Sequence, residues 1–205
     1  MPIRLIHWLL VVLIAVLWWT AENGQMDNHR LAGYSVLALI IFRLYWGFTG
    51  SNTAKFSHFI KTPAVTWQYA RRLFQSGKSR SIGHNPLGGY SVMLLLTLLS
   101  IQLITGLFAI DVDGWEAGPL NHYISFEAGR LCATWHEYTF NTILAWIVLH
   151  VLAIAYYLFW RKQNLIFAMF SGKVKGVKDS GFIPARRHHY FIGLALALIT
   201  LWLLL

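Results

Sequence analysis

Five long apolar stretches constrain this chain more than any other feature of its sequence. A helix needs about 20 apolar residues to cross a bilayer, and each stretch reaches or approaches that length. The stretches run from Ile3 to Thr20, Arg30 to Phe48, Leu87 to Ile110, Trp135 to Trp160 and Tyr190 to Leu205. The whole chain is 57% hydrophobic and 12% charged, whereas soluble domains carry about 25% charged residues. We therefore expect an all-α integral membrane protein.

The first four stretches predict a four-helix transmembrane bundle over residues 1–170. Residues 171–205 are expected to form a linker followed by a fifth, C-terminal transmembrane helix. The first stretch could instead be a secretory signal. However, its charged region is only Met1 to Arg4, and the residues near Thr20 are not the small ones that cleavage prefers. We interpret it as an uncleaved anchor.

Basic residues gather in alternate connections between the expected spans. The connection after the second span carries Lys55, Lys61, Arg71, Arg72, Lys78 and Arg80. The stretch after the fourth span carries Arg161, Lys162, Lys173, Lys175, Lys178, Arg186 and Arg187 against Asp179. The other two connections carry Glu22, Asp27, Asp111, Asp113, Glu116 and Glu127 against Arg30 and Arg130. This positive-inside pattern predicts a multi-pass protein of the bacterial inner membrane with a cytoplasmic N-terminus, and it explains the net charge of +9 without nucleic acid.

Two histidines of the fourth span, His136 and His150, are fourteen residues apart. At about 100° per residue this spacing is roughly 40° short of four turns, so both side chains leave one face of the helix. They are separated by about 21 Å along its axis, which is most of the hydrocarbon thickness. His7 begins the first span and His29 begins the second.

Depth in the membrane decides which of these histidines can meet. The first and second spans run in opposite directions, so His7 lies near the cytoplasmic surface and His29 near the periplasmic surface. The fourth span places His136 outside and His150 inside. We therefore pair His7 with His150 and His29 with His136, each pair holding one haem iron. A lone histidine in a span is often only a packing residue, but intramembrane ionisable residues are costly, and two depth-matched pairs favour ligation.

Further residues share the expected surroundings of the haems. Gly33 follows His29 by one turn, where a missing side chain would let a porphyrin approach. Arg43 lies at the depth of the cytoplasmic pair and could bind a haem propionate, or it could simply extend to the interface. Gly106 is expected to make room for the periplasmic haem or to serve helix packing, and Arg130 could bind its propionate. His84 could relay a quinone's proton or be merely solvated.

The single cysteine, Cys132, excludes the Cys-x-x-Cys-His motif of covalent haem attachment, so both haems would be non-covalent haem b. The residues from Asp111 to Thr134 are expected to form a periplasmic loop. Six tryptophans near span ends predict an interfacial aromatic belt: Trp18, Trp19, Trp46, Trp115, Trp135 and Trp160.

Three patterns resemble the bacterial cytochrome b561 family, which includes the b-type cytochrome subunit of nickel–iron hydrogenases. They are Ile6-His7-Trp8, the His29-x3-Gly33-x9-Arg43 pattern, and Trp135-His136-Glu137 with His150 fourteen positions later. The resemblance covers roughly Met1 to Phe170. It implies a four-helix bundle with two bis-histidine b haems that moves electrons between quinone and a redox partner. The fifth span exceeds the minimal four-helix members.

Three functions remain open from the sequence. The first is electron transfer across the membrane between quinone and a periplasmic cytochrome or hydrogenase-like enzyme. The second is a self-contained superoxide:quinone oxidoreductase, which would need a cationic periplasmic funnel, whereas the periplasmic connections are acidic. The third is a metal-ion carrier, which would usually add intramembrane carboxylates or broken helices near the midplane.

Overall fold

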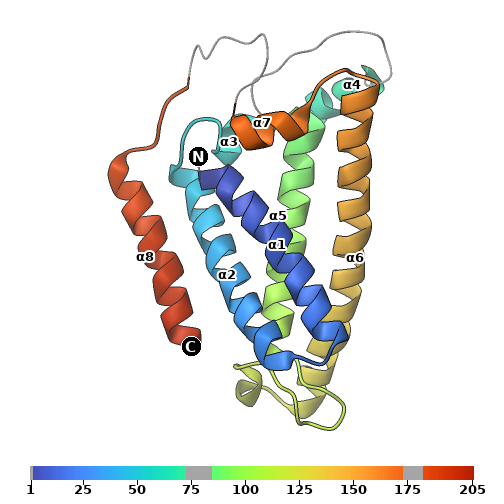
Figure 1. Cartoon of the computed structure of the whole chain (residues 1–205), viewed down its shortest axis with the longest axis vertical. Coiled ribbons are helices and arrows are strands. Elements are labelled where there is room, and N and C mark those ends of the chain that lie inside the picture. Colours follow the sequence, from blue (N-terminus) through green and yellow to red (C-terminus); the bar gives the residue numbers. More distant parts are fainter. Residues whose placement is uncertain (1, 73–84, 173–181) are drawn as a thin grey trace.

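The computed structural model describes residues 2–72, 85–172 and 182–205, and these residues form an all-helical protein (Figure 1). Five helices of this described part are long and apolar enough to cross a membrane, which confirms the five predicted spans. They are α1 (Pro2–Glu22), α2 (Met26–Thr49), α5 (Pro86–Phe108), α6 (Phe126–Phe159) and α8 (Arg187–Leu204). Shorter helical segments are α3 (Phe56–Phe59), α4 (Pro63–Arg72), α7 (Leu165–Ser171) and the 3₁₀ turn η1 (Asn121–Tyr123).

Helix α6 begins earlier than its hydropathy suggested, so the predicted loop from Asp111 to Thr134 is too long. The Ser125 side chain accepts a hydrogen bond from the Ala128 amide and caps the helix, and Glu127 lies in its first turn. A carboxylate there is favourable because the helix N-terminus carries partial positive charge. With 34 residues, α6 is about 51 Å long and extends beyond a hydrocarbon layer of about 30 Å.

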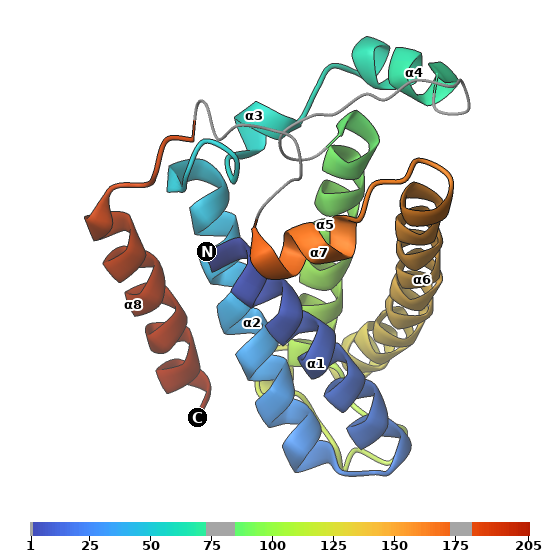
Figure 2. The same ribbon diagram turned by 45° about the horizontal axis from the view of Figure 1, so that its top comes forward.

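Helix α2 is the central helix of the bundle. It packs against α1, α5 and α8, while α5 and α6 pack against each other (Figures 1 and 2). The buried apolar core joins α2, α3, α5 and α6. Its members are Val36, Ile40, Phe56, Phe59, Leu96, Leu99 and Ile143. Large apolar side chains elsewhere on the spans remain exposed, Trp202 of α8 by 78% for example, as expected of a lipid-facing surface.

The two ends of the bundle differ in their connections. The N-terminus, α3, α4 and α7 lie at one end, here called the N-terminal face, together with the start of α8 (Figure 1). The turn η1 and the end of α8 lie at the other end, here called the opposite face. This arrangement follows from five successive crossings, and it places the described parts of both basic connections at the N-terminal face.

Helix α8 lies outside the other four spanning helices and is held against α2 by close packing. A Cβ atom at Gly193 would lie 2.9 Å from a ring carbon of Phe42, so a side chain there would push the two helices or the ring apart. Tyr190 of α8 covers the ring of Trp46, with 4.4 Å between ring centres. As a result Trp46 is only 1% exposed, and its predicted place in an interfacial belt is wrong.

Candidate functional site

The structure brings the four predicted histidines together in two pairs. His7 of α1 faces His150 of α6, with 6.4 Å between ring centres and 52° between ring planes. His29 of α2 faces His136 of α6, with 6.3 Å between ring centres and 70° between planes. These are the pairs that membrane depth predicts.

The spacing of each pair suits one metal ion between two imidazoles. A metal held about 2.0 Å from each nitrogen, with each ring centre about 1.1 Å behind its nitrogen, sets ring centres roughly 6.2 Å apart. The observed 6.3 and 6.4 Å match this spacing closely. Within residues 2–72, 85–172 and 182–205, no three His, Cys, Asp or Glu side chains gather around a common point. Two protein ligands suit haem iron, since a porphyrin supplies the other four, better than a bare zinc ion, which takes three or four.

The His29–His136 pair is oriented by hydrogen bonds to neighbouring helices. Nδ1 of His29 lies 3.0 Å from the Leu17 carbonyl oxygen of α1. Nδ1 of His136 lies 2.9 Å from the Gln102 carbonyl oxygen of α5. A carbonyl oxygen only accepts, so Nδ1 carries the proton and donates in both rings. Each Nε2 therefore keeps its lone pair for a metal, and the bond increases the basicity of the ligand.

The His7–His150 pair has different surroundings. Nδ1 of His7 is buried and finds no hydrogen-bond partner among the described residues. Its ring lies edge-on to Trp8, with 5.1 Å between centres, and Trp8 stacks on Phe170 of α7 at 4.3 Å. Aromatic packing, rather than hydrogen bonding to a carbonyl, therefore positions His7.

Arg43 is a buried cation on α2. It is 5% exposed, and its guanidinium carbon lies 4.9 Å from the centre of the Phe56 ring. Its Nη1 and the Nε1 of Trp46, one turn further along α2, are buried and have no hydrogen-bond partner in the described part of the chain. A buried charge is costly unless it is paired. The guanidinium of Arg43, unpaired among the described residues, fits a carboxylate of a bound group, and a haem propionate is of that chemistry, whereas Trp46 faces Tyr190 of α8.

The two predicted glycines have different environments. The position of a Cβ at Gly33 is nearly open, since its nearest neighbour, the Leu17 side chain, is 4.0 Å away. This space is compatible with the predicted approach of a flat ring. A Cβ at Gly106 would lie only 2.8 Å from Cε1 of His136. Gly106 thus makes room for the imidazole itself.

The structure places Arg130 against a main-chain carbonyl. The Nη1 of Arg130 donates to the Ile110 carbonyl oxygen at 2.8 Å, which ties α6 to the chain that follows α5. His84 lies outside the described residues. Cys132 is a free, half-buried cysteine of α6.

Comparison with known proteins identifies the family. The model of the family described as prokaryotic cytochrome b561 matches residues 1–172. The chain belongs to this family. Its members are b-type cytochromes, so membership implies haem b and electron transfer in a multi-pass membrane protein.

Several relatives carry the description "Probable Ni/Fe-hydrogenase B-type cytochrome subunit". The Azotobacter chroococcum mcd 1 protein is 24% identical, and the match covers 83% of this chain and 85% of the relative. The Cupriavidus necator H16 protein is 25% identical, with 83% of each chain covered. The Rhizobium leguminosarum bv. viciae protein is 26% identical, with 84% of this chain and 85% of the relative covered. No solved structure gave a significant match.

Proposed function

We propose that this chain is a di-haem b-type cytochrome that carries electrons across the membrane between quinone and a periplasmic redox partner. The single observation that carries the proposal is the pair spacing of 6.3 and 6.4 Å at two depths of α6. The two sites would be about 21 Å apart along that helix. Residues 1–170 would form this electron-carrying bundle, and the family match over residues 1–172 supports that boundary.

The chain's own residues would determine what each haem does. A bound haem supplies iron that alternates between ferrous and ferric states. His7 with His150, and His29 with His136, would be the protein ligands of the two haems, and two histidines per haem suit electron transfer better than oxygen binding. Arg43 would pair with a propionate. The Leu17 and Gln102 carbonyls would fix the His29 and His136 rings so that little reorganisation accompanies each electron.

The orientation of the protein in the membrane is inferred from where its basic residues lie. The N-terminal face carries basic residues, including Lys55, Arg71 and Arg187, which supports a cytoplasmic location for that face in a bacterial inner membrane. The His29–His136 haem would then lie toward the periplasm. A hydrogenase-like enzyme is a suitable partner there, since the relatives are described as hydrogenase cytochrome subunits.

The two alternatives have less support. A superoxide:quinone oxidoreductase would need free cations at the opposite face. Arg30 is there, but it is paired with Asp27 and Glu116 at 2.6 Å each, and Arg130 donates to the Ile110 carbonyl oxygen. A metal-ion carrier would need more than two protein ligands at each site, and the histidines of the described residues gather only in pairs.

Electron transfer across a membrane is the direct test. The purified haem-loaded protein would be placed in liposomes that contain entrapped ferricyanide and membrane quinone, and the quinone would be reduced from outside. We expect ferricyanide to be reduced with the wild-type protein and at least tenfold more slowly with His136→Ala. His122→Ala, which changes a histidine of η1 outside both pairs, should behave like the wild type. Equal rates with His136→Ala and the wild type would refute the proposed route.

A further inference from the structure

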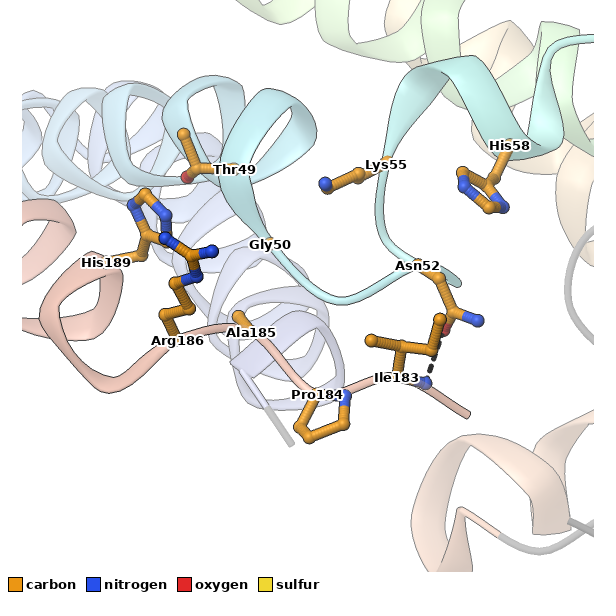
Figure 3. A pocket seen from close by; sticks show the side chains of 10 residues that line it. All are labelled: Thr49, Gly50, Asn52, Lys55, His58, Ile183, Pro184, Ala185, Arg186 and His189. Atoms are coloured by element: carbon orange, nitrogen blue, oxygen red, sulfur yellow. Dashed lines mark hydrogen bonds between the residues drawn. The ribbon is translucent and has the colours of Figure 1, made fainter. Parts of the chain in front are cut away.

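A cavity of about 380 Å³ opens at the N-terminal face, between the end of α2 and the start of α8. One wall contains Lys55 and His58, which follow α2, and the other contains Arg186 and His189 at the start of α8 (Figure 3). The volume falls within the range of about 300–1,000 Å³ that is usual for small-molecule sites. Helix α8 lies beyond the region that the family model matches, so family membership does not account for this cavity.

Hydrogen bonds hold the two walls together. The main-chain N–H of Asn52 donates to the Ile183 carbonyl oxygen at 3.2 Å. The main-chain N–H of Ile183 donates to the side-chain Oδ1 of Asn52, also at 3.2 Å. Nearby, the Tyr45 hydroxyl lies 2.8 Å from Nδ1 of His189 and forms a hydrogen bond with it. The cavity is therefore formed before any ligand binds, which reduces the entropic cost of binding.

The side chains of the cavity favour an anion. Lys55 and Arg186 are charged, and no lining residue is acidic. Both salt bridges found among the described residues belong to Arg30, so neither Lys55 nor Arg186 is paired with a described carboxylate. The C-terminus of α2 and the N-terminus of α8 carry opposite partial charges and largely cancel. The positive potential thus comes from the basic side chains.

The position of the cavity favours a lipid headgroup as the anionic ligand. It lies where two membrane-spanning helices end, at the level where lipid headgroups are expected. Ile183 and Pro184 line it, and Ile183 is 65% exposed, so apolar side chains adjoin the basic ones. Basic pockets between transmembrane helices commonly bind anionic lipid headgroups.

We propose that this cavity binds the phosphate of an anionic phospholipid, with Lys55 and Arg186 as its cationic partners. The apolar side chains of Ile183 and Pro184 would contact the glycerol backbone and the adjoining acyl carbons. The bound lipid would bridge α2 and α8 and strengthen the attachment of the fifth span. A free phosphate ion shares the charge but lacks the apolar part of these contacts.

Native mass spectrometry can test the proposal with the full-length, haem-loaded protein in detergent. Phosphatidylglycerol, phosphatidylcholine and inorganic phosphate would be titrated separately, and retained adducts counted. We expect one phosphatidylglycerol to be retained in preference to phosphatidylcholine. The double variant Lys55→Gln/Arg186→Gln should lower its affinity roughly 30-fold, since each basic side chain near a membrane surface contributes about fivefold. Millimolar inorganic phosphate should not displace the lipid.

The matched control removes two charges from the same face but outside the cavity. Arg71 and Arg187 are exposed and do not line it, so Arg71→Gln/Arg187→Gln should change lipid affinity less than threefold. Equal losses in the two double variants would show general surface attraction and overturn the site. Displacement by phosphate would identify a free-anion site and overturn the lipid assignment. The single variants, each expected to lose about fivefold, provide the same test if the double variant does not fold.

Discussion

Replacing Gly106 with alanine tests whether His136 is positioned to bind a haem. The new Cβ would lie 2.8 Å from Cε1 and 3.1 Å from Nδ1 of His136. Non-bonded carbon atoms prefer about 3.5 Å or more, so the ring must retreat from α5 by roughly 0.7 Å. That movement would stretch the hydrogen bond from Nδ1 to the Gln102 carbonyl oxygen, now 2.9 Å, toward a distance at which it no longer counts as one.

The expected loss of haem affinity follows from the shifted His136 ring and the weakened hydrogen bond together. Removing a hydrogen bond that orients a metal-bound histidine typically costs 10- to 100-fold in affinity, or about 1.4–2.8 kcal/mol. We therefore expect Gly106→Ala to lower haem affinity at the His29–His136 pair by this factor. The haem content of the purified protein should fall from two toward one per chain. The His7–His150 site should keep its haem because none of its contacts involve Gly106.

Pyridine haemochrome quantitation against protein concentration, with a potentiometric titration to show which haem remains, would measure this effect. Gly193→Ala is the matched control, since its Cβ would meet Phe42 at 2.9 Å, a similar crowding at the α2–α8 contact that touches no histidine of either pair. We expect its haem content to equal that of the wild type. Equal haem loss in the two variants, or selective loss of the His7–His150 haem after Gly106→Ala, would refute the reasoning.

Three further outcomes follow from the structure. Arg43→Gln should lower the midpoint potential of the His7–His150 haem by on the order of 60 mV, because a buried cation favours the reduced form. In the same potentiometric titration, Arg43→Lys should lower that potential less. The His29–His136 haem should have the more negative midpoint of the two, because its ligands donate to carbonyls; the reverse order would contradict that argument. Gly193→Val should destabilise the α2–α8 contact by about 1–3 kcal/mol without loss of haem, which thermal unfolding followed by circular dichroism would detect.

The helices and the histidine pairs could be predicted because each depends on short-range regularities of the sequence. Apolar length gives the spans, and alternating direction with the 3.6-residue turn gives the depth of His7, His29, His136 and His150. Hydropathy could not find the true start of α6, since Ser125 caps the helix well before its apolar part begins. The Ser125-x-Glu127 sequence was the available signal for that start.

Other features of the site depend on contacts that no local pattern records. Trp46 is buried because α8 returns to cover it with Tyr190, and a span-end tryptophan alone does not reveal such a neighbour. The partners of His29 and His136 are main-chain carbonyls of Leu17 and Gln102, which any residue type supplies. The cavity joins residues that follow α2 to residues before and within α8, so only the three-dimensional arrangement brings them together.

The number of haems bound by each chain tests the central claim most directly. Pyridine haemochrome analysis of the purified protein, combined with quantitative amino-acid analysis, measures that ratio. Two histidine pairs with metal-compatible spacing predict two haem b molecules per chain, both extracted by acidified acetone because Cys132 offers no covalent attachment motif. A ratio of one, or haem that resists extraction, would contradict the account.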